Sequence, residues 1–329
     1  MDAATPATLD RGASAPARAA GAALRNALTV DAEEYFQVAA FERTLPRASW
    51  DGLESRVEFS MGRVLDLFAS RACKATFFVL GWVAERHPAL LRRMVAEGHE
   101  VASHGYDHTR VHQLTPAQFR ADVVRTKALL EDIGGAPVRG YRAPSYSIDA
   151  RNLWALDILR ETGHDYSSSI YPIRHDLYGM PEAPRFPFRF KPDGILEIPV
   201  TTVRVGGRNY PCGGGGYFRL LPYGGFRRML RRVNERDGQP GLFYFHPWEV
   251  DPGQPRVQDA PLKSRFRHYL NLGSMHARLE RLLADFRWGR MDEIFLTPSP
   301  VPLAGEVASY TSPGLAGEVG RRPGEGVPE

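Results

Sequence analysis

The chain has 329 residues, of which 43% are hydrophobic and 24% are charged, close to the average of globular domains. This apolar content supports a substantial core and excludes both a disordered chain and a small domain that depends on disulfides. The net charge of +4 arises from 42 basic and 38 acidic residues that are interspersed, so the sequence predicts no nucleic-acid partner.

The two ends of the chain and its cysteines bear on its location. No segment has the ~18–20 consecutive apolar residues of a membrane helix, and residues 1–26 lack the apolar core of a secretory signal. We expect a disordered leader at 1–26 and a disordered tail at 302–329, because neither has a periodic apolar face. Cys73 and Cys212 leave a disulfide open, although two reduced thiols in a soluble cytosolic protein is the simpler interpretation.

Short apolar runs alternate with amphipathic segments between these ends. The runs typical of buried strands are 27–30, 75–80, 99–103, 138–142, 166–170, 195–205 and 241–245. The segments with helical spacing are 58–69, 88–96, 115–133, 150–161 and 223–234. Pro88 and Thr115 are typical of helix starts. Alternation of these lengths predicts a parallel α/β architecture.

Polar residues follow four of the predicted strands, where parallel α/β folds gather their ligands. They are Asp31, Glu33 and Glu34 after the first strand, His104 and His108 after the third, Arg142 and Tyr146 after the fourth, and His246 after the last. Each set alone has an ordinary explanation, such as a solvated acidic loop or a hydrogen-bonded turn histidine. Together, one carboxylate and two imidazoles form a ligand set with open positions, suited to Zn²⁺, Fe²⁺ or Co²⁺.

The remaining polar residues supply the other parts of a metal-assisted hydrolase. A bound ion polarises a carbonyl oxygen and lowers the pKa of water toward ~7. A separate Asp can accept a proton, a separate His can deliver one to the leaving group, and a guanidinium can keep the Asp ionised. The pattern therefore predicts hydrolysis assisted by a divalent metal ion.

Four stretches resemble motifs of the polysaccharide deacetylase (NodB-homology) family, whose members remove N-acetyl groups from sugar polymers. They are Leu28–Gln37, Ser103–His108, Arg142–Tyr146 and Leu242–Pro252. The first and last of these, with Ser264–Asn271, also resemble the branch associated with exosortase and exopolysaccharide loci. The similarity covers roughly residues 27–298 and implies a distorted (β/α) barrel.

The resemblance also implies a domain organisation. It gives a single catalytic domain over residues 27–301, with a family-specific C-terminal part from about residue 200 to residue 301.

Site roles follow from the resemblance, motif by motif. It implies that Asp31 is the general base, that Arg142 orients it, and that His104 and His108 are metal ligands. The backbone N–H of Tyr146 corresponds to an oxyanion donor beside the ion.

The last motif implies that His246 is the general acid, with Asp165 holding its other ring nitrogen. The common family form has adjacent aspartates, base then ligand, whereas position 32 here is Ala. The carboxylate ligand then shifts to Glu33 or Glu34, and members with Asp-x-Asp favour Glu33. We expect zinc, with cobalt and iron as alternatives.

Two departures concern the acyl pocket. The family's Leu two residues before the last His is Tyr244, and the Trp expected near Asp165 is absent. The acyl preference stays open, and Trp248 or Trp82 could supply apolar cover.

The sequence thus predicts a metal-dependent hydrolase that removes N-acetyl groups from N-acetylhexosamine units of an exopolysaccharide or its lipid-linked precursor. One alternative is a small-amide hydrolase on the same fold. Another is a catalytically silent glycan-binding protein of a polymer-export system, motivated by Ala32 and Tyr244.

We expect the protein in the cytoplasm, at the inner membrane face if its substrate is lipid-linked. Arginines 227, 228, 231 and 232 are interpreted as a solvated helix face. A second interpretation, contact with acidic lipids, would give peripheral membrane association.

Overall fold

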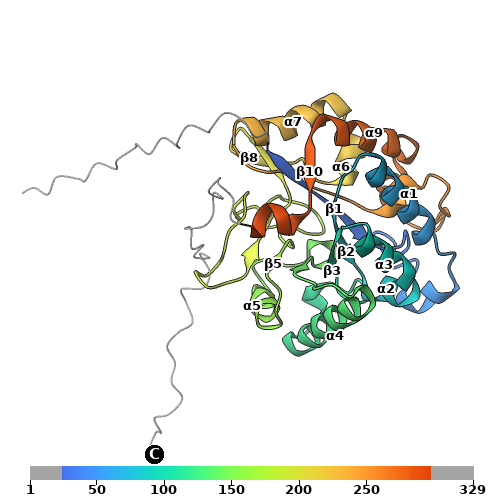
Figure 1. Cartoon of the computed structure of the whole chain (residues 1–329). Helices are drawn as coiled ribbons and strands as arrows, with labels where there is room; N and C mark the ends of the chain where they lie inside the picture. The colour runs from blue at the N-terminus through green and yellow to red at the C-terminus, as the bar shows by residue number, and fades with distance from the viewer. Residues whose placement is uncertain (1–23, 298–329) are drawn as a thin grey trace, which may run out of the picture.

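The computed structural model describes residues 24–297 and has the predicted alternation of strands and helices (Figure 1). The predicted tail and most of the predicted leader lie outside these residues. Arg25 and Asn26 already belong to the first strand, so the leader boundary at residue 26 was set two residues too late.

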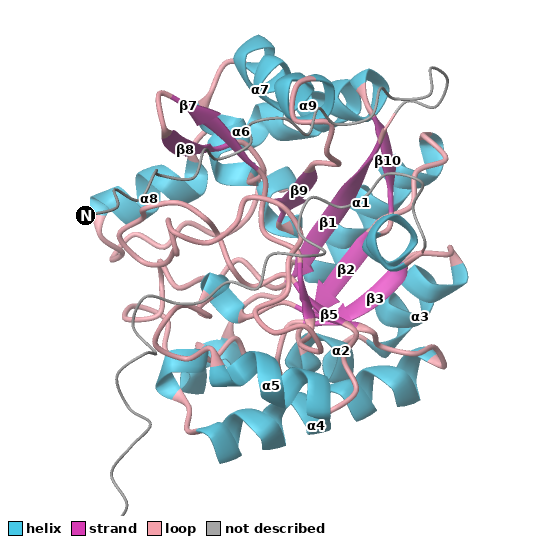
Figure 2. Cartoon of the chain, turned by 90° about the vertical axis from the view of Figure 1, so that its left-hand side faces the viewer, coloured by secondary structure: helices cyan, strands magenta, loops and turns pink. Residues whose placement is uncertain are grey.

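A parallel sheet of eight strands forms the centre of the molecule (Figure 2). Its strands are β1 (Arg25–Ala32), β2 (Thr76–Val79), β3 (Glu100–Ser103), β4 (Gly140–Tyr141), β5 (Tyr166–Ser167), β6 (Leu196–Glu197), β9 (Leu242–Phe245) and β10 (Arg287–Gly289). The order is β10-β1-β2-β3-β4-β5-β6, and β9 pairs with β1. Because every pairing is parallel, the carboxyl ends of all these strands meet at one edge.

Helices surround the sheet, as expected where parallel strands are buried on both faces. They are α1 (Val57–Ser70), α2 (Gly81–Arg86), α3 (Pro88–Ala96), α4 (Pro116–Gly134), α5 (Trp154–Glu161), α6 (Gly215–Leu220), α7 (Tyr223–Glu235), α8 (Leu262–Tyr269) and α9 (Leu272–Asp285). The predictions for α1, α3, α4, α5 and α7 are confirmed within a few residues. The arginines of α7 lie outside its buried face, which consists of Tyr223, Phe226, Leu230 and Val233.

One predicted strand was wrong. The run 195–205 forms two strands, β6 and β7 (Thr202–Val205), and β7 leaves the main sheet to pair antiparallel with β8 (Arg208–Pro211). Pro199 lies between them and has no backbone N–H to continue a ladder. Gly206 and Gly207 form the tight turn of this hairpin with φ of 56° and 80°, a conformation that favours glycine.

Of the two interpretations of the cysteines, the structure has the two free thiols and no disulfide between them. Cys73 and Cys212 are free, buried, and packed in separate apolar clusters. Within residues 24–297, no helix combines the length and apolar character needed to cross a membrane.

Replacing Thr115 by Ala is expected to lower the free energy of unfolding by about 1 kcal/mol. Thr115 Oγ1 accepts a hydrogen bond from the Gln118 N–H at 3.3 Å, and Gln118 Oε1 accepts one from the Thr115 N–H at 2.9 Å. This reciprocal pair satisfies two N–H groups at the start of α4. Urea denaturation measures the change, and T115S, which keeps the hydroxyl, is the control. An Ala variant as stable as the parent would contradict the contribution of this cap.

Candidate active site and metal centre

The predicted site residues converge at the carboxyl edge of the sheet. Asp31 lies near the end of β1, His104 directly follows β3, Arg142 follows β4 and His246 follows β9. The register brings the first and last of these together, because Val30 of β1 pairs with Phe245 of β9. Strand pairing therefore assembles groups that are more than two hundred positions apart in the chain.

A candidate metal centre consists of Glu33, His104 and His108. One ligand atom from each lies within 4.8 Å of the other two. Glu33 Oε2 is 3.0 Å from His108 Nε2 and 4.0 Å from His104 Nε2. His108 adopts a φ of 61°, a rare backbone conformation outside glycine that concentrates at functional sites.

The protonation states of these groups suit cation binding. His104 Nδ1 lies 2.8 Å from the Arg142 carbonyl oxygen, which can only accept, so Nδ1 carries the proton and Nε2 offers a lone pair. Burial, with His108 nearby, lowers the pKa of His104 to about 3. Burial raises the pKa of Glu33, but His108 and His246 more than offset this and leave it below its ordinary value. Both groups are thus in the forms that bind metals.

Glu34, the alternative ligand, points elsewhere. Its Oε1 accepts the backbone N–H of Arg56 and of Val57 at 3.1 Å each, at the start of α1, and the Ser55 hydroxyl also donates to it. Glu34 therefore caps a helix, and only Glu33 of the two faces the histidines.

Asp31 is held by a buried ion pair. Arg142 Nη1 donates to Asp31 Oδ1 at 2.6 Å and to Thr29 Oγ1 at 2.9 Å, while Nη2 donates to Ser168 Oγ at 3.1 Å. Asp31 and Arg142 are 2% and 0% exposed, and the guanidinium stacks on the Phe78 ring at 3.9 Å. These contacts leave Asp31 Oδ2 directed toward His246, whose Nε2 is 3.9 Å away.

His246 lies beside both Asp31 and the candidate metal centre. Its Nε2 lies 3.6 Å from Glu33 Oε1, and its side chain remains 22% exposed. Burial opposes its positive charge, yet the carboxylates of Glu33, Glu249 and Asp31 raise the pKa of His246 to about 9. A protonated imidazole beside a carboxylate base is the arrangement that general acid–base chemistry requires.

Asp165 was wrongly predicted as the partner of His246. It pairs with Arg139 at 2.5 Å, is 48% exposed, and precedes β5, at the opposite edge of the sheet from the site. The carboxylate that holds His246 is Glu249, whose Oε1 accepts from Nδ1 at 2.9 Å and from the His246 backbone N–H at 3.0 Å. The spacing His-x-x-Glu resembles that of a capping box and was the sequence signal available for this contact.

The backbone N–H of Tyr146 has a partner other than a substrate. It donates to the Ala143 carbonyl at 3.0 Å within the 3₁₀ turn Pro144–Tyr146. The Tyr146 ring packs on Tyr244 at 4.9 Å and Tyr171 at 5.6 Å. An oxyanion role for this N–H requires the turn to open, so it stays a prediction. Tyr244 itself lies beside His246, with ring centres 5.8 Å apart.

The two tryptophans considered as apolar cover differ in position. Trp248 stacks on His246 at 4.9 Å and donates its Nε1–H to Glu33 Oε1 at 3.3 Å. Trp82 packs instead on Trp50 and Phe36 in the core. Only Trp248 lies at the site.

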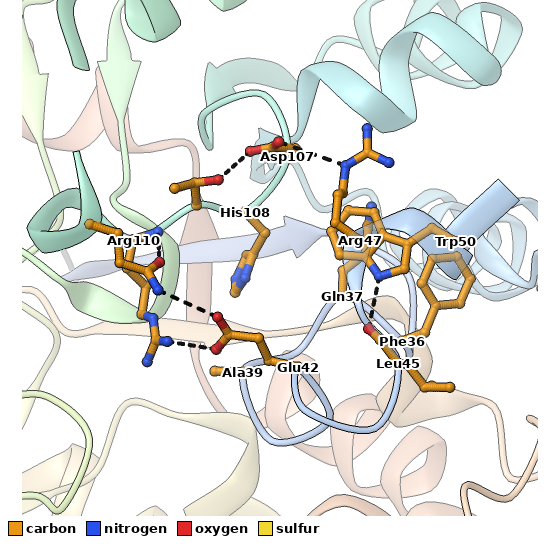
Figure 3. A pocket seen from close by; sticks show the side chains of 12 residues that line it. Phe36, Gln37, Ala39, Glu42, Leu45, Arg47, Trp50, Asp107, His108 and Arg110 are labelled. Carbon is orange, nitrogen blue, oxygen red and sulfur yellow. Dashed lines mark hydrogen bonds and ion pairs between the residues drawn. The ribbon is translucent and has the colours of Figure 1, made fainter. Parts of the chain in front are cut away.

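A pocket of about 100 Å³ opens beside His108. Figure 3 shows the His108 ring between two ion pairs of this pocket, Asp107–Arg47 and Arg110–Glu42. One candidate metal ligand is thus accessible from a small cavity lined by both polar and apolar side chains.

Comparisons with known proteins match two parts of this chain to described families. Residues 51–167 match the family described as polysaccharide deacetylase, and residues 168–296 match a family described as a domain of unknown function (DUF3473).

Two curated relatives are chitooligosaccharide deacetylases. The chain is 39% identical over 97 residues to that of Bradyrhizobium sp. (strain ANU 289), covering 29% of this chain and 42% of that protein. It is 38% identical over 129 residues to that of Sinorhizobium fredii (strain NBRC 101917 / NGR234), covering 36% and 55%. The chain thus spans about half the length of these relatives.

Two solved structures share the fold across most of both chains. A putative polysaccharide deacetylase from Mycobacterium smegmatis has a TM-score of 0.57 at 18% identity and covers 85% of this chain and 92% of its own. Puue allantoinase has a TM-score of 0.52 at 15% identity, with 82% and 88% covered. The likeness shows the distorted α/β barrel alone. The match over residues 51–167 identifies a polysaccharide deacetylase domain in that part of the chain, where two of the ordered motifs lie.

Proposed function

We propose that this protein is a metal-dependent hydrolase that removes N-acetyl groups from N-acetylhexosamine units of a polysaccharide. The observation that carries the proposal is the convergence of a three-residue ligand set with the buried Asp31–Arg142 pair and with His246. Each feature alone occurs in ordinary cores, whereas their combination at one sheet edge has a catalytic explanation.

The residues present fit a divalent metal ion. Glu33 Oε2 is buried, lies between two imidazoles, and receives no hydrogen bond from any residue of the described part of the chain. One carboxylate and two imidazoles with open positions suit zinc, with cobalt or iron as alternatives. When bound, such an ion supplies Lewis-acid polarisation of the amide carbonyl and acidifies the attacking water.

The chain's own residues supply the proton transfers. Asp31 accepts the proton of the attacking water, because Arg142 holds its Oδ1 and leaves Oδ2 directed toward His246. His246 donates a proton to the departing amine nitrogen from Nε2, since Nδ1 is committed to Glu249. The proposed base and acid thus present Oδ2 and Nε2 to the same site, 3.9 Å apart.

The substrate class is proposed from relatives and from sequence. The chitooligosaccharide deacetylases named above support an N-acetylated glycan. The resemblance of Ser264–Asn271 and of the first and last motifs to an exopolysaccharide-associated branch supports an exopolysaccharide or its lipid-linked precursor.

The decisive experiment pairs elemental analysis of the purified protein with acetate release from chitin-type oligomers. We expect one divalent ion per chain and acetate release that ceases on chelation and returns with zinc. Glycan binding without acetate release by metal-replete protein would contradict the proposal in favour of a silent binding protein. Turnover of small amides with no turnover of oligosaccharides would contradict the substrate class.

A further inference from the structure

The imidazole of His246 is held by Glu249, which forms a buried charge pair with Arg219. Arg219 takes no part in the proton transfers proposed above. Glu249 Oε1 binds both the Nδ1–H and the backbone N–H of His246. The other carboxylate oxygen, Oε2, accepts from Arg219 Nε at 2.6 Å. The side chains of Arg219 and Glu249 are 2% and 1% exposed, so both charges are removed from solvent.

The guanidinium of Arg219 is fixed by a cage of backbone carbonyls. Nη1 donates to the His268 carbonyl at 2.9 Å and also to that of Leu270, and Nη2 donates to the Arg267 carbonyl at 3.1 Å. These carbonyls belong to Ser264–Asn271, the stretch that the sequence singled out without a role. A guanidinium is suited to such a cage because its donors form a rigid, planar fork.

Two further contacts restrict the positions of Glu249 and His246. Gly215, one turn before Arg219 on α6, lies so close that a Cβ there would stand 2.3 Å from Glu249 Oε1. The His268 ring stacks on Trp248 at 4.0 Å, and Trp248 stacks in turn on His246. Residues 264–271 thus support His246 in two ways. His268 contacts the face of its ring through Trp248, and the backbone carbonyls hold its Nδ1 atom through Arg219 and Glu249.

We infer that Arg219 is a positioning residue for His246, acting through Glu249, and that the backbone of residues 267–270 fixes it in place. Burial opposes ionisation of Glu249, but Arg219 and His246 lower its pKa below the ordinary value. An ionised Glu249 accepts from Nδ1–H and leaves Nε2 as the nitrogen that faces the amine. This assigns a task to the region matched only by a family of unknown function.

The test compares two leaving groups, because the inference rests on the proposed role of His246 as general acid. A sugar amine needs a proton to depart, whereas 4-nitrophenolate does not. We expect E249Q and R219M to lower kcat for an N-acetylated chitin oligomer by about 10²-fold, with KM within about twofold. Hydrolysis of 4-nitrophenyl acetate should change by less than about threefold. A parallel loss on both substrates, or no loss on the amide, would overturn the inference.

Arg278 offers a matched control. It also donates to three backbone carbonyls, those of Phe218, Arg219 and Leu221, but within residues 24–297 it forms no ion pair with a carboxylate. R278M should leave the ratio of amide to ester hydrolysis unchanged. If R219M does not fold, R219K tests Arg219 itself, because it keeps the charge but lacks the planar fork of donors and should show the same selective loss. E249Q, which is nearly isosteric, tests the step from Glu249 to His246.

A measurement without turnover separates this inference from the proposed function. In histidine-labelled protein, the Nδ1 proton shared with Glu249 should give a downfield NMR resonance, assigned by its loss in H246Q. It should vanish or move upfield in R219M and E249Q and persist in R278M. An unchanged resonance in R219M would overturn the inference. If the resonance changes as expected in R219M and E249Q but the parent protein deacetylates no glycan, the positioning role of Arg219 stands and the proposed function is wrong.

Discussion

Replacing Asp31 by Asn is expected to lower kcat for acetate release by about 10³-fold while the protein keeps its bound metal. Asn has nearly the same shape and can still accept the hydrogen bond from Arg142 Nη1, so the surrounding structure should persist. It cannot take a proton from water, however, and the general base would be lost. Acetate release measures the rate, and elemental analysis measures the metal.

Asp165 provides the control for this substitution. It is an aspartate in an ion pair with an arginine, as Asp31 is, but its partner is Arg139 and it is exposed at the opposite edge of the sheet. D165N should therefore retain activity within about twofold. Full acetate release by D31N would contradict the base assignment, and a large loss in D165N would restore the role that the sequence had given it.

The second large effect is expected at the carboxylate ligand. Replacing Glu33 by Gln should weaken metal binding by at least about 10²-fold. This is more than the loss of affinity usual when a residue that only hydrogen-bonds a metal ligand is changed. The amide is neutral, whereas the carboxylate lies within 4.0 Å of both imidazoles and carries the charge that balances a cation. Dialysis against zinc buffers, followed by elemental analysis, measures the change in affinity.

Glu34 is the matched control, one position further along the chain. Its carboxylate accepts N–H groups of Arg56 and Val57 at the start of α1. E34Q is therefore expected to keep the metal and to lower the free energy of unfolding by about 1 kcal/mol. Loss of metal from E34Q with retention by E33Q would exchange the two assignments.

Much of the fold could be predicted because its signals are local. The buried run around β2 and the Thr115 cap of α4 indicate their structures without tertiary information. The segment 195–205 was predicted as one strand because its apolar pattern continues through Pro199. In the structure the strand ends before this proline and the chain leaves the main sheet. Helix α9 was missed although its buried face, Leu272, Met275, Leu279, Leu282 and Leu283, has regular spacing.

The site shows the same division between local and distant information. Parallel strands place their carboxyl ends together, so residues that directly follow β1, β3, β4 and β9 could be assigned to one edge. Asp165 fails this rule, since it precedes β5, and was carried over from the family pattern alone. Arg219 could not be found from sequence, because its contacts join a helix to carbonyls about fifty residues away.

Arg142 contacts both halves of the proposed chemistry through different atoms. Its guanidinium binds Asp31, and its carbonyl oxygen accepts the Nδ1–H of His104. A small displacement of the end of β4 would therefore act on both Asp31, the proposed proton acceptor, and His104, a proposed metal ligand. A substitution that moved this strand end would therefore be expected to disturb proton transfer and metal binding together.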